Sequence, residues 1–179
     1  LKTVDPNIDR NSEHTKKVLK KLKELEHSGY EFEGAEASLE ILIAKQLGKF
    51  EPHFSLGKFS VIIQEPTENG FSCIASVKIS VDGEDEMTAA EGEGPVNALD
   101  IAIRRALGVF YPELKKMTLA DYKVRVLGSK DGTASKVRVL ITSTNGKKTW
   151  RTVGVSTDII DASWKALVDS VEYFLGVVR

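Results

Sequence analysis

The amino-acid sequence predicts an α+β fold, in which a short helical linker precedes two βββα units in a pseudo-twofold layered domain. Apolar residues recur at helical spacing as far as Leu47, and after Pro52 they alternate with polar ones. From there the order strand–strand–strand–helix occurs twice, which is the pattern of an internal repeat. Because alternation places one strand face in water, both sheets should be antiparallel and covered on one side only.

Two helices are expected before the first strand. Asn11 or Ser12 can cap the first, and Gly29 lies just beyond its end. The second should cover residues 33–47. The first helix has only a narrow apolar stripe among many lysines, so we expect it to rest on a neighbouring element. Two short helices without a sheet do not form a domain, and residues 1–50 are therefore predicted to be a helical linker subdomain.

The repeated units are expected at about residues 54–108 and 118–179, and together they form a predicted domain over residues 54–179. Hairpin-type pairs separate the strands at Asn69-Gly70, Asp82-Gly83, Asp131-Gly132 and Asn145-Gly146. The expected strands cover residues 59–64, 71–81, 87–92, 122–126, 137–141 and 150–155. The expected helices run from Pro95 to Gly108 and from about Ile160 to Phe174.

Composition and charge exclude several classes of function. The 179 residues are 41% apolar and 28% charged, which excludes disorder by composition, and no apolar run is long enough to span a membrane. The net charge of −1 does not recruit nucleic acid or a membrane surface. A single cysteine excludes an internal disulfide and fits a cytoplasmic location. The chain starts at Leu1 without a signal pattern, so we expect it to be a piece of a longer protein.

Charge is distributed unevenly between the two units. Residues 53–117 carry 6 basic and 10 acidic side chains, a net of −4, whereas residues 118–179 carry 10 basic and 6 acidic, a net of +4. Opposite charge favours docking of one segment on the other, within a chain or between chains. Alternatively, the difference in net charge means only that the two segments expose solvated faces of different composition.

Side chains for catalysis are scarce. The histidines, His14, His27 and His53, have no ligand partner at metal-binding spacing, and Cys73 lies on the apolar face of an expected strand. The acidic run at residues 84–86 fits an exposed turn. The sequence therefore predicts a module that is not an enzyme, has no metal site and needs no cofactor.

Two glycine-rich turns lead directly into the expected helices of the units, at residues 92–95 and 154–158. Glycine lets backbone N–H groups approach a ligand, and the N-terminus of a helix favours a carboxylate or phosphate. A tight strand-to-helix turn explains the same glycines without a ligand. Because Asp158 and Asp161 would cap the second helix and compete with an anion, the first turn is the better candidate despite Glu93.

Four segments, in this order, resemble the C-terminal part of the isopropylmalate, citramalate and homocitrate synthase family. They are residues 30–38 (YEFEGAEAS), 92–98 (GEGPVNA), 119–126 (LADYKVRV) and 153–164 (VGVSTDIIDASW). The first and last look most like the citramalate synthase branch. Isopropylmalate synthases usually have Glu-His after Asp-Tyr-x, whereas this chain has Lys123-Val124-Arg125, which counts against that branch.

The resemblance implies a parent enzyme of branched-chain amino acid biosynthesis with three parts. An N-terminal barrel condenses acetyl-CoA with a 2-oxo acid, using a divalent metal held by an H-x-H pair and an acid, and this set is absent here. A helical linker and a regulatory domain of two βββα units follow. In this family the regulatory domain dimerises and binds the end-product amino acid, isoleucine for citramalate synthase and leucine for isopropylmalate synthase.

The resemblance also implies the effector-binding residues. They are Gly92, Gly94, Pro95 and Asn97, faced by Asp121, Tyr122, Thr133 and Ala134. We expect the α-carboxylate of the effector on the N–H groups at Gly94, its ammonium on Asp121, and its aliphatic side chain on an apolar wall.

Two other classes of function fit the same pattern. A helix followed by βββα is also the order of a double-stranded-RNA-binding domain, but such a domain needs lysines where the last helix begins. This chain has Asp158 and Asp161 there, and Glu93 at the equivalent turn. A purely structural dimerisation domain without an effector site is the second alternative.

Overall fold

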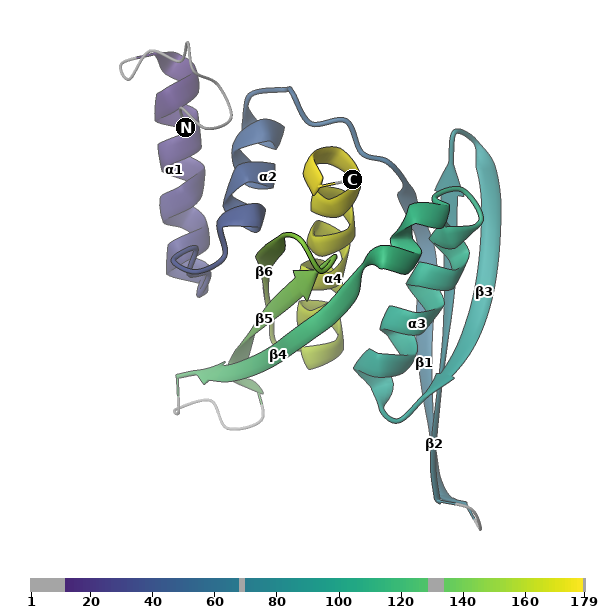
Figure 1. The fold of residues 1–179 in the computed structure, drawn as a ribbon. Helices are drawn as coiled ribbons and strands as arrows, with labels where there is room; N and C mark the ends of the chain where they lie inside the picture. The colour runs from purple at the N-terminus through teal and green to yellow at the C-terminus, as the bar shows by residue number, and fades with distance from the viewer. Residues whose placement is uncertain (1–11, 68–69, 129–133, 179) are drawn as a thin grey trace. The chain divides into compact units, whose positions relative to one another are not determined.

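The computed structural model describes residues 12–67, 70–128 and 134–178 (Figure 1). The chain divides into two compact units. One, called here the β1–β3 unit, comprises Pro52–Thr118 and Phe174–Val177. The other, the β4–β6 unit, comprises the N-terminal segment up to Glu51 together with Leu119–Tyr173. The fold is α+β, with three strands in each unit, as the sequence predicts.

The β1–β3 unit contains the first repeat. Its elements are β1 (Ser55–Thr67), β2 (Gly70–Val81), β3 (Glu84–Gly92), α3 (Pro95–Gly108) and η1 (Pro112–Lys116). The strands are antiparallel in the order β1-β2-β3. Asp82 and Gly83 both have positive φ, 51° and 87°, as the tight turn of a two-residue hairpin requires. The Asp82-Gly83 turn is therefore confirmed, whereas Asn69 lies outside the described residues.

One face of this sheet is dry. Cys73, Ala75, Val77 and Ile79 on β2 are 0% exposed, and the residues between them are partly exposed. Helix α3 lies along this face (Figure 1) and packs on all three strands. Its apolar stripe (Leu99, Ile103, Ala106 and Leu107) is fully buried. The predicted one-sided coverage of the sheet is therefore confirmed for this unit.

The β4–β6 unit contains the second repeat. Its strands are β4 (Thr118–Leu127), β5 (Lys136–Thr144) and β6 (Thr149–Ser156), followed by α4 (Ile159–Tyr173). The π-helical turn after α4 (Phe174–Val178) belongs, as far as Val177, to the β1–β3 unit. The order is β4-β5-β6, with β5 and β6 antiparallel. Helix α4 packs on β5 and β6. The Asn145-Gly146 turn is present, with Gly146 at φ 82°, and the Asp131-Gly132 pair lies outside the described residues.

The two glycines that precede the helices have the same packing role. A Cβ on Gly92 would lie 2.4 Å from the backbone N of Ala98, and one on Gly154 would lie 2.0 Å from the carbonyl O of Ala162. Each glycine therefore lets a strand and the helix that follows it meet backbone to backbone. Gly92 and Gly154 thus have equivalent roles in the two units, and so do the helix residues that they meet, Ala98 and Ala162.

The N-terminal helices belong to the β4–β6 unit. Helix α1 (Glu13–Ser28) is capped by Ser12, whose Oγ accepts from the Thr15 N–H at 3.1 Å, and it ends at Gly29, with φ 110°. Helix α2 (Glu36–Gln46) packs on α4 and β6. It begins three residues later than predicted, because Gly34 adopts φ 77°. Helix α1 packs on α2, so the first helix rests on a neighbouring element, as expected.

Candidate functional site

The first glycine turn forms the N-terminus of α3. Gly94 is the residue that precedes the helix, in an extended conformation, and no side chain caps α3. Pro95 has no N–H of its own to satisfy. The Asn97 side chain points back along the turn, where its Oδ1 accepts from the Glu93 N–H at 3.1 Å. This helix end is thus left open to an anion, since its first N–H groups have no side-chain acceptor.

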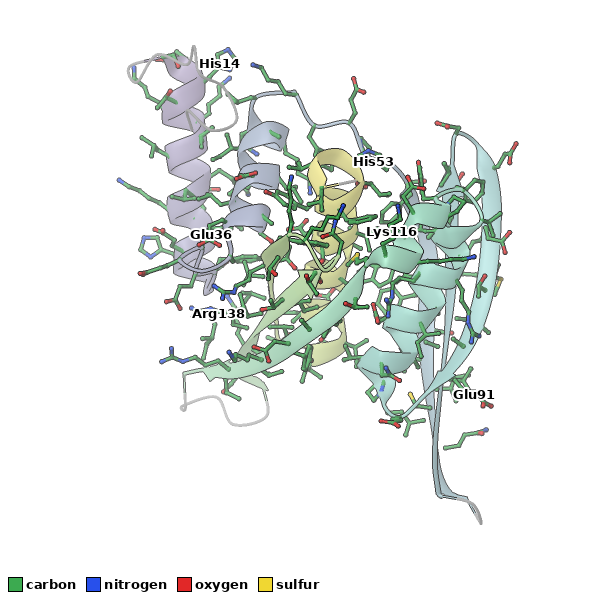
Figure 2. The ribbon with its side chains drawn as sticks, in the orientation of Figure 1. His14, Glu36, His53, Glu91, Lys116 and Arg138 are labelled. Carbon is green, nitrogen blue, oxygen red and sulfur yellow. The ribbon has the colours of Figure 1, made fainter. Side chains whose placement is uncertain are left out.

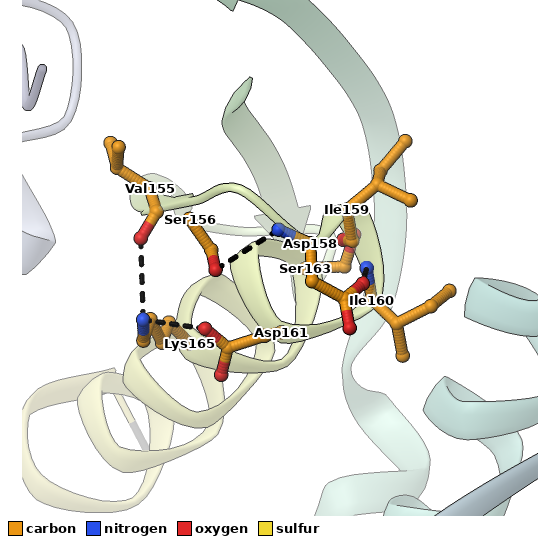
Figure 3. A network of polar contacts seen from close by, with 8 residues as sticks. All are labelled: Val155, Ser156, Asp158, Ile159, Ile160, Asp161, Ser163 and Lys165. Carbon is orange, nitrogen blue, oxygen red and sulfur yellow. Dashed lines mark hydrogen bonds and ion pairs between the residues drawn. The ribbon is translucent and has the colours of Figure 1, made fainter. Parts of the chain in front are cut away.

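The second glycine turn is closed by its own side chains (Figure 3). Asp158 Oδ1 accepts from the Ile160 N–H at 2.7 Å, and the Asp158 N–H donates to Ser156 Oγ at 3.2 Å. The predicted cap by Asp158 is confirmed. Asp161 forms an ion pair with Lys165 at 2.6 Å, since it lies one turn before that lysine on α4. Asp158 already occupies the helix N-terminus, as a bound anion would.

The other predicted effector contacts lie in the β4–β6 unit. Asp121, on β4, pairs with Lys123 at 2.8 Å, and this hydrogen bond holds the pKa of the Asp121 carboxyl below its usual value. Its Oδ1 also accepts from the Tyr122 N–H at 3.0 Å. The Tyr122 hydroxyl lies 2.8 Å from Ser163 Oγ on α4. Asp121 is therefore an ionised, half-exposed carboxylate that can accept an ammonium group.

The predicted set is divided between the two units. Gly92, Gly94, Pro95 and Asn97 are brought together on one turn of the β1–β3 unit. Asp121 and Tyr122 are neighbours on β4, and Ala134 is exposed just before β5. Thr133 lies outside the described residues.

The histidines and the cysteine do not assemble into a site. His14 lies at the start of α1 and His53 on the segment before β1, far apart in the sequence (Figure 2). Cys73 is 0% exposed, and burial raises the pKa of its thiol, so it is an inert core residue. Within residues 12–67, 70–128 and 134–178, no group of three or more histidine, cysteine or acidic side chains is arranged to hold a metal ion.

The β4–β6 unit also contains a cavity that no motif of the sequence indicates. A cavity of about 310 Å³ lies in the β4–β6 unit among α1, α2, β6 and α4. Its polar side chains include Lys45, Lys165 and Asp169. No motif joins these residues, because the segments that carry them are more than a hundred residues apart and meet only through the packing of α2 on α4.

Comparisons with known proteins agree on one family. The model of the LeuA allosteric (dimerisation) domain matches residues 33–175. The (R)-citramalate synthase of Aquifex aeolicus is 48% identical over 98% of this chain, which covers 33% of that protein. That of Geobacter sulfurreducens is 50% identical over 94% of this chain and 32% of its own length. The 2-isopropylmalate synthase of Aquifex aeolicus is 30% identical over 89% of this chain, which covers 28% of it.

The chain therefore spans about a third of the length of the curated relatives it matches. No helix in the described part of the chain is long and apolar enough to cross a membrane.

Proposed function

Because this chain belongs to the LeuA allosteric (dimerisation) domain family, we propose that it is the regulatory part of a citramalate synthase-like enzyme. The parent enzyme would condense acetyl-CoA with a 2-oxo acid in branched-chain amino acid biosynthesis. The family supports homodimer formation. In this proposal the chain itself is not catalytic, and isoleucine binds to it as a feedback inhibitor.

The choice of isoleucine rests on the branch of the family. Five (R)-citramalate synthases that match more than nine-tenths of this chain are 36–50% identical to it, against 30% for the Aquifex isopropylmalate synthase. Lys123-Val124-Arg125 also stands where isopropylmalate synthases usually have Glu-His after Asp-Tyr-x. A leucine-binding domain and a purely structural dimerisation domain are the alternatives.

The observation that carries the proposal is the difference between the two helix N-termini. The α4 terminus has its own carboxylate cap, whereas no side chain caps α3. An amino-acid α-carboxylate at Gly94 would take the place of that cap. Its ammonium would pair with an acidic side chain, for which we propose Asp121. The side chains of isoleucine and leucine differ only in shape, so selectivity between them should be modest, with about 1–3 kcal/mol available for a misplaced methylene.

Inhibition requires that the effector binds one arrangement of the dimer better than another. A coupling free energy of about 1–3 kcal/mol would be ordinary for such a system. The effector would act by shifting the population between arrangements and would need no contact with the catalytic barrel.

Thermal unfolding of the 179-residue chain tests the proposal. Isoleucine should raise Tm with saturation, because a ligand that binds only the folded state stabilises it. In the Asp121→Asn variant, the isoleucine concentration that gives half of the maximal rise in Tm should be at least tenfold higher. The matched control is Asp158→Asn, which changes an acid at the turn that is already capped, and it should keep the full response.

Each other result has a definite meaning. A response to leucine alone would select the isopropylmalate synthase alternative, and a response to duplex RNA would select the RNA-binding one. No response to either amino acid would leave the structural dimerisation domain.

A further inference from the structure

The cavity in the β4–β6 unit is partly open to solvent, and it is lined by the N-terminal helical segment on one side and by β6 and α4 on the other. Leu25 on α1, Leu42 on α2, Val153 on β6 and Val168 on α4 all reach it. Its volume of about 310 Å³ is at the lower end of the range for small-molecule sites. None of the residues predicted from the sequence to bind the effector lines it.

Most of the wall is apolar. Tyr30 and Phe32 stack with their ring centroids 5.7 Å apart, and Phe32 is buried. Trp164, 6% exposed, contributes an aromatic surface from α4. Such a wall suits a short aliphatic chain, which gains by leaving water.

The polar groups of the lining have an excess of positive charge. Lys45 and Lys165 are both cations, and Asp169 is the one acid among the lining residues. Asp169 is already engaged, since its Oδ2 accepts from Ser38 Oγ at 2.8 Å and its Oδ1 lies 3.7 Å from Lys45 Nζ. Lys165, 44% exposed, donates to the Val155 carbonyl and to Asp161 at the cavity edge.

We propose that this cavity binds a small aliphatic monocarboxylate, with its hydrocarbon chain against the aromatic wall and its carboxylate between Lys45 and Lys165. Asp169 and Asp161 already lie beside these two lysines, and the bound carboxylate would share both cations with them. An amine would meet two lysines, and a dicarboxylate would place its second charge near Asp169. The site is distinct from the proposed effector site, because its ligand needs no ammonium group.

A ligand in this cavity would also join elements that are far apart in the sequence. It would contact α2 on one side and α4 on the other, so its binding would add to the stability of the helical segment on the β4–β6 unit. Ionic strength should weaken the binding, because both lysines are partly exposed.

The test uses the two tryptophans as internal probes. In an NMR titration of the ¹⁵N-labelled chain with 3-methylpentanoate, the indole N–H resonance of Trp164 should shift with saturation. The Trp150 indole should not follow it, because its N–H is held by Ser170 Oγ at 2.9 Å and it does not line the cavity. The neutral isostere 3-methylpentanamide should bind at least tenfold more weakly.

Three variants give the result its specificity. Lys45→Met with Lys165→Met should weaken binding at least tenfold, since methionine keeps the length of the side chain without its charge. The matched control, Lys17→Met with Lys20→Met on the exposed face of α1, should leave it unchanged. Val168→Phe, at a partly exposed position, should block the cavity and abolish the Trp164 shift.

Asp121→Asn separates this site from the proposed effector site, because it should leave 3-methylpentanoate binding intact. The proposal is overturned if the Trp164 resonance does not move, if acid and amide bind equally well, or if the double lysine-to-methionine variant binds as the parent does.

Discussion

The Oγ of Ser38 accepts a hydrogen bond from the backbone N–H of Val153 at 3.0 Å. Val153 lies on β6, the edge strand of its sheet, and Ser38 lies on α2. The same hydroxyl donates to Asp169 on α4 at 2.8 Å. The Ser38 hydroxyl thus accepts from an edge-strand N–H that would otherwise lack a hydrogen-bond partner. Through its two hydrogen bonds it joins α2, β6 and α4.

Ser38→Ala should therefore destabilise the fold. Removing the hydroxyl leaves the buried Val153 N–H without an acceptor and takes one donor from Asp169, which keeps its ion pair with Lys45, at a cost of about 1–3 kcal/mol. Denaturant unfolding measures this loss. The matched control is Ser60→Ala, whose exposed hydroxyl contacts only Ser76 at the sheet surface, and it should change the free energy of unfolding by less than about 0.5 kcal/mol. Equal losses in the two variants would contradict the role given to Ser38.

Gly154→Ala should be among the most damaging small substitutions in the chain. The new methyl would overlap the carbonyl of Ala162, so α4 must shift on the sheet, at a cost of about 3 kcal/mol. Gly94→Ala is the control, because nothing lies within 4 Å of a Cβ there and its backbone is extended. Thermal unfolding should show a large drop in Tm for the first variant and almost none for the second.

Arg138 should control the stability of the α1 C-terminus. Its Nε donates to the Gly29 carbonyl at 2.8 Å, and its guanidinium pairs with Glu31 beside the loop that joins α1 and α2 (Figure 2). Arg138→Gln should lower the local stability by about 1–2 kcal/mol, because hydrogen bonds to charged groups are the stronger ones.

Amide hydrogen exchange reports this change, with faster exchange in the last turns of α1 and no change in β2. Arg151→Gln, at an exposed position on β6, should leave both regions as they are. Slow exchange of α1 in the Arg138 variant would show that the helix end is held by other contacts.

The Tyr173 hydroxyl should ionise only at high pH. Burial, and then the hydrogen bond that its hydroxyl donates to Glu40 at 3.0 Å, raise its pKa from 10.0 to about 12. Since the folded pKa is the higher one, this contact stabilises the fold fully below pH 10 and is lost as pH rises toward 12. A tyrosinate absorbance titration should show a step near 12 that Tyr173→Phe removes. A titration of the folded chain that is complete below pH 11 would contradict the contact.

Much of each unit could be predicted from local patterns. The alternation of apolar and polar residues predicts that every second residue from Cys73 to Ile79 lies on one buried face. Ser12 and Gly29 mark the ends of α1. These features can be predicted because they depend on neighbours along the chain. Elements whose position depends on packing with distant segments are harder to predict from the sequence. The η1 turn at residues 112–116 was not expected, and its position is set by Arg104, which donates to the Met117 carbonyl at 2.8 Å.

In the candidate sites, too, some features follow from the local sequence and others depend on tertiary packing. The sequence alone determined the repeat, the glycine turns and the family, since spacing and residue type are enough to specify backbone turns and strand faces. Only the tertiary structure decided that Asp158 closes one turn while α3 has no side-chain cap, and that Lys45, Lys165 and Asp169 surround one cavity. These relationships depend on which distant segments pack together, and no local pattern of residues carries that information.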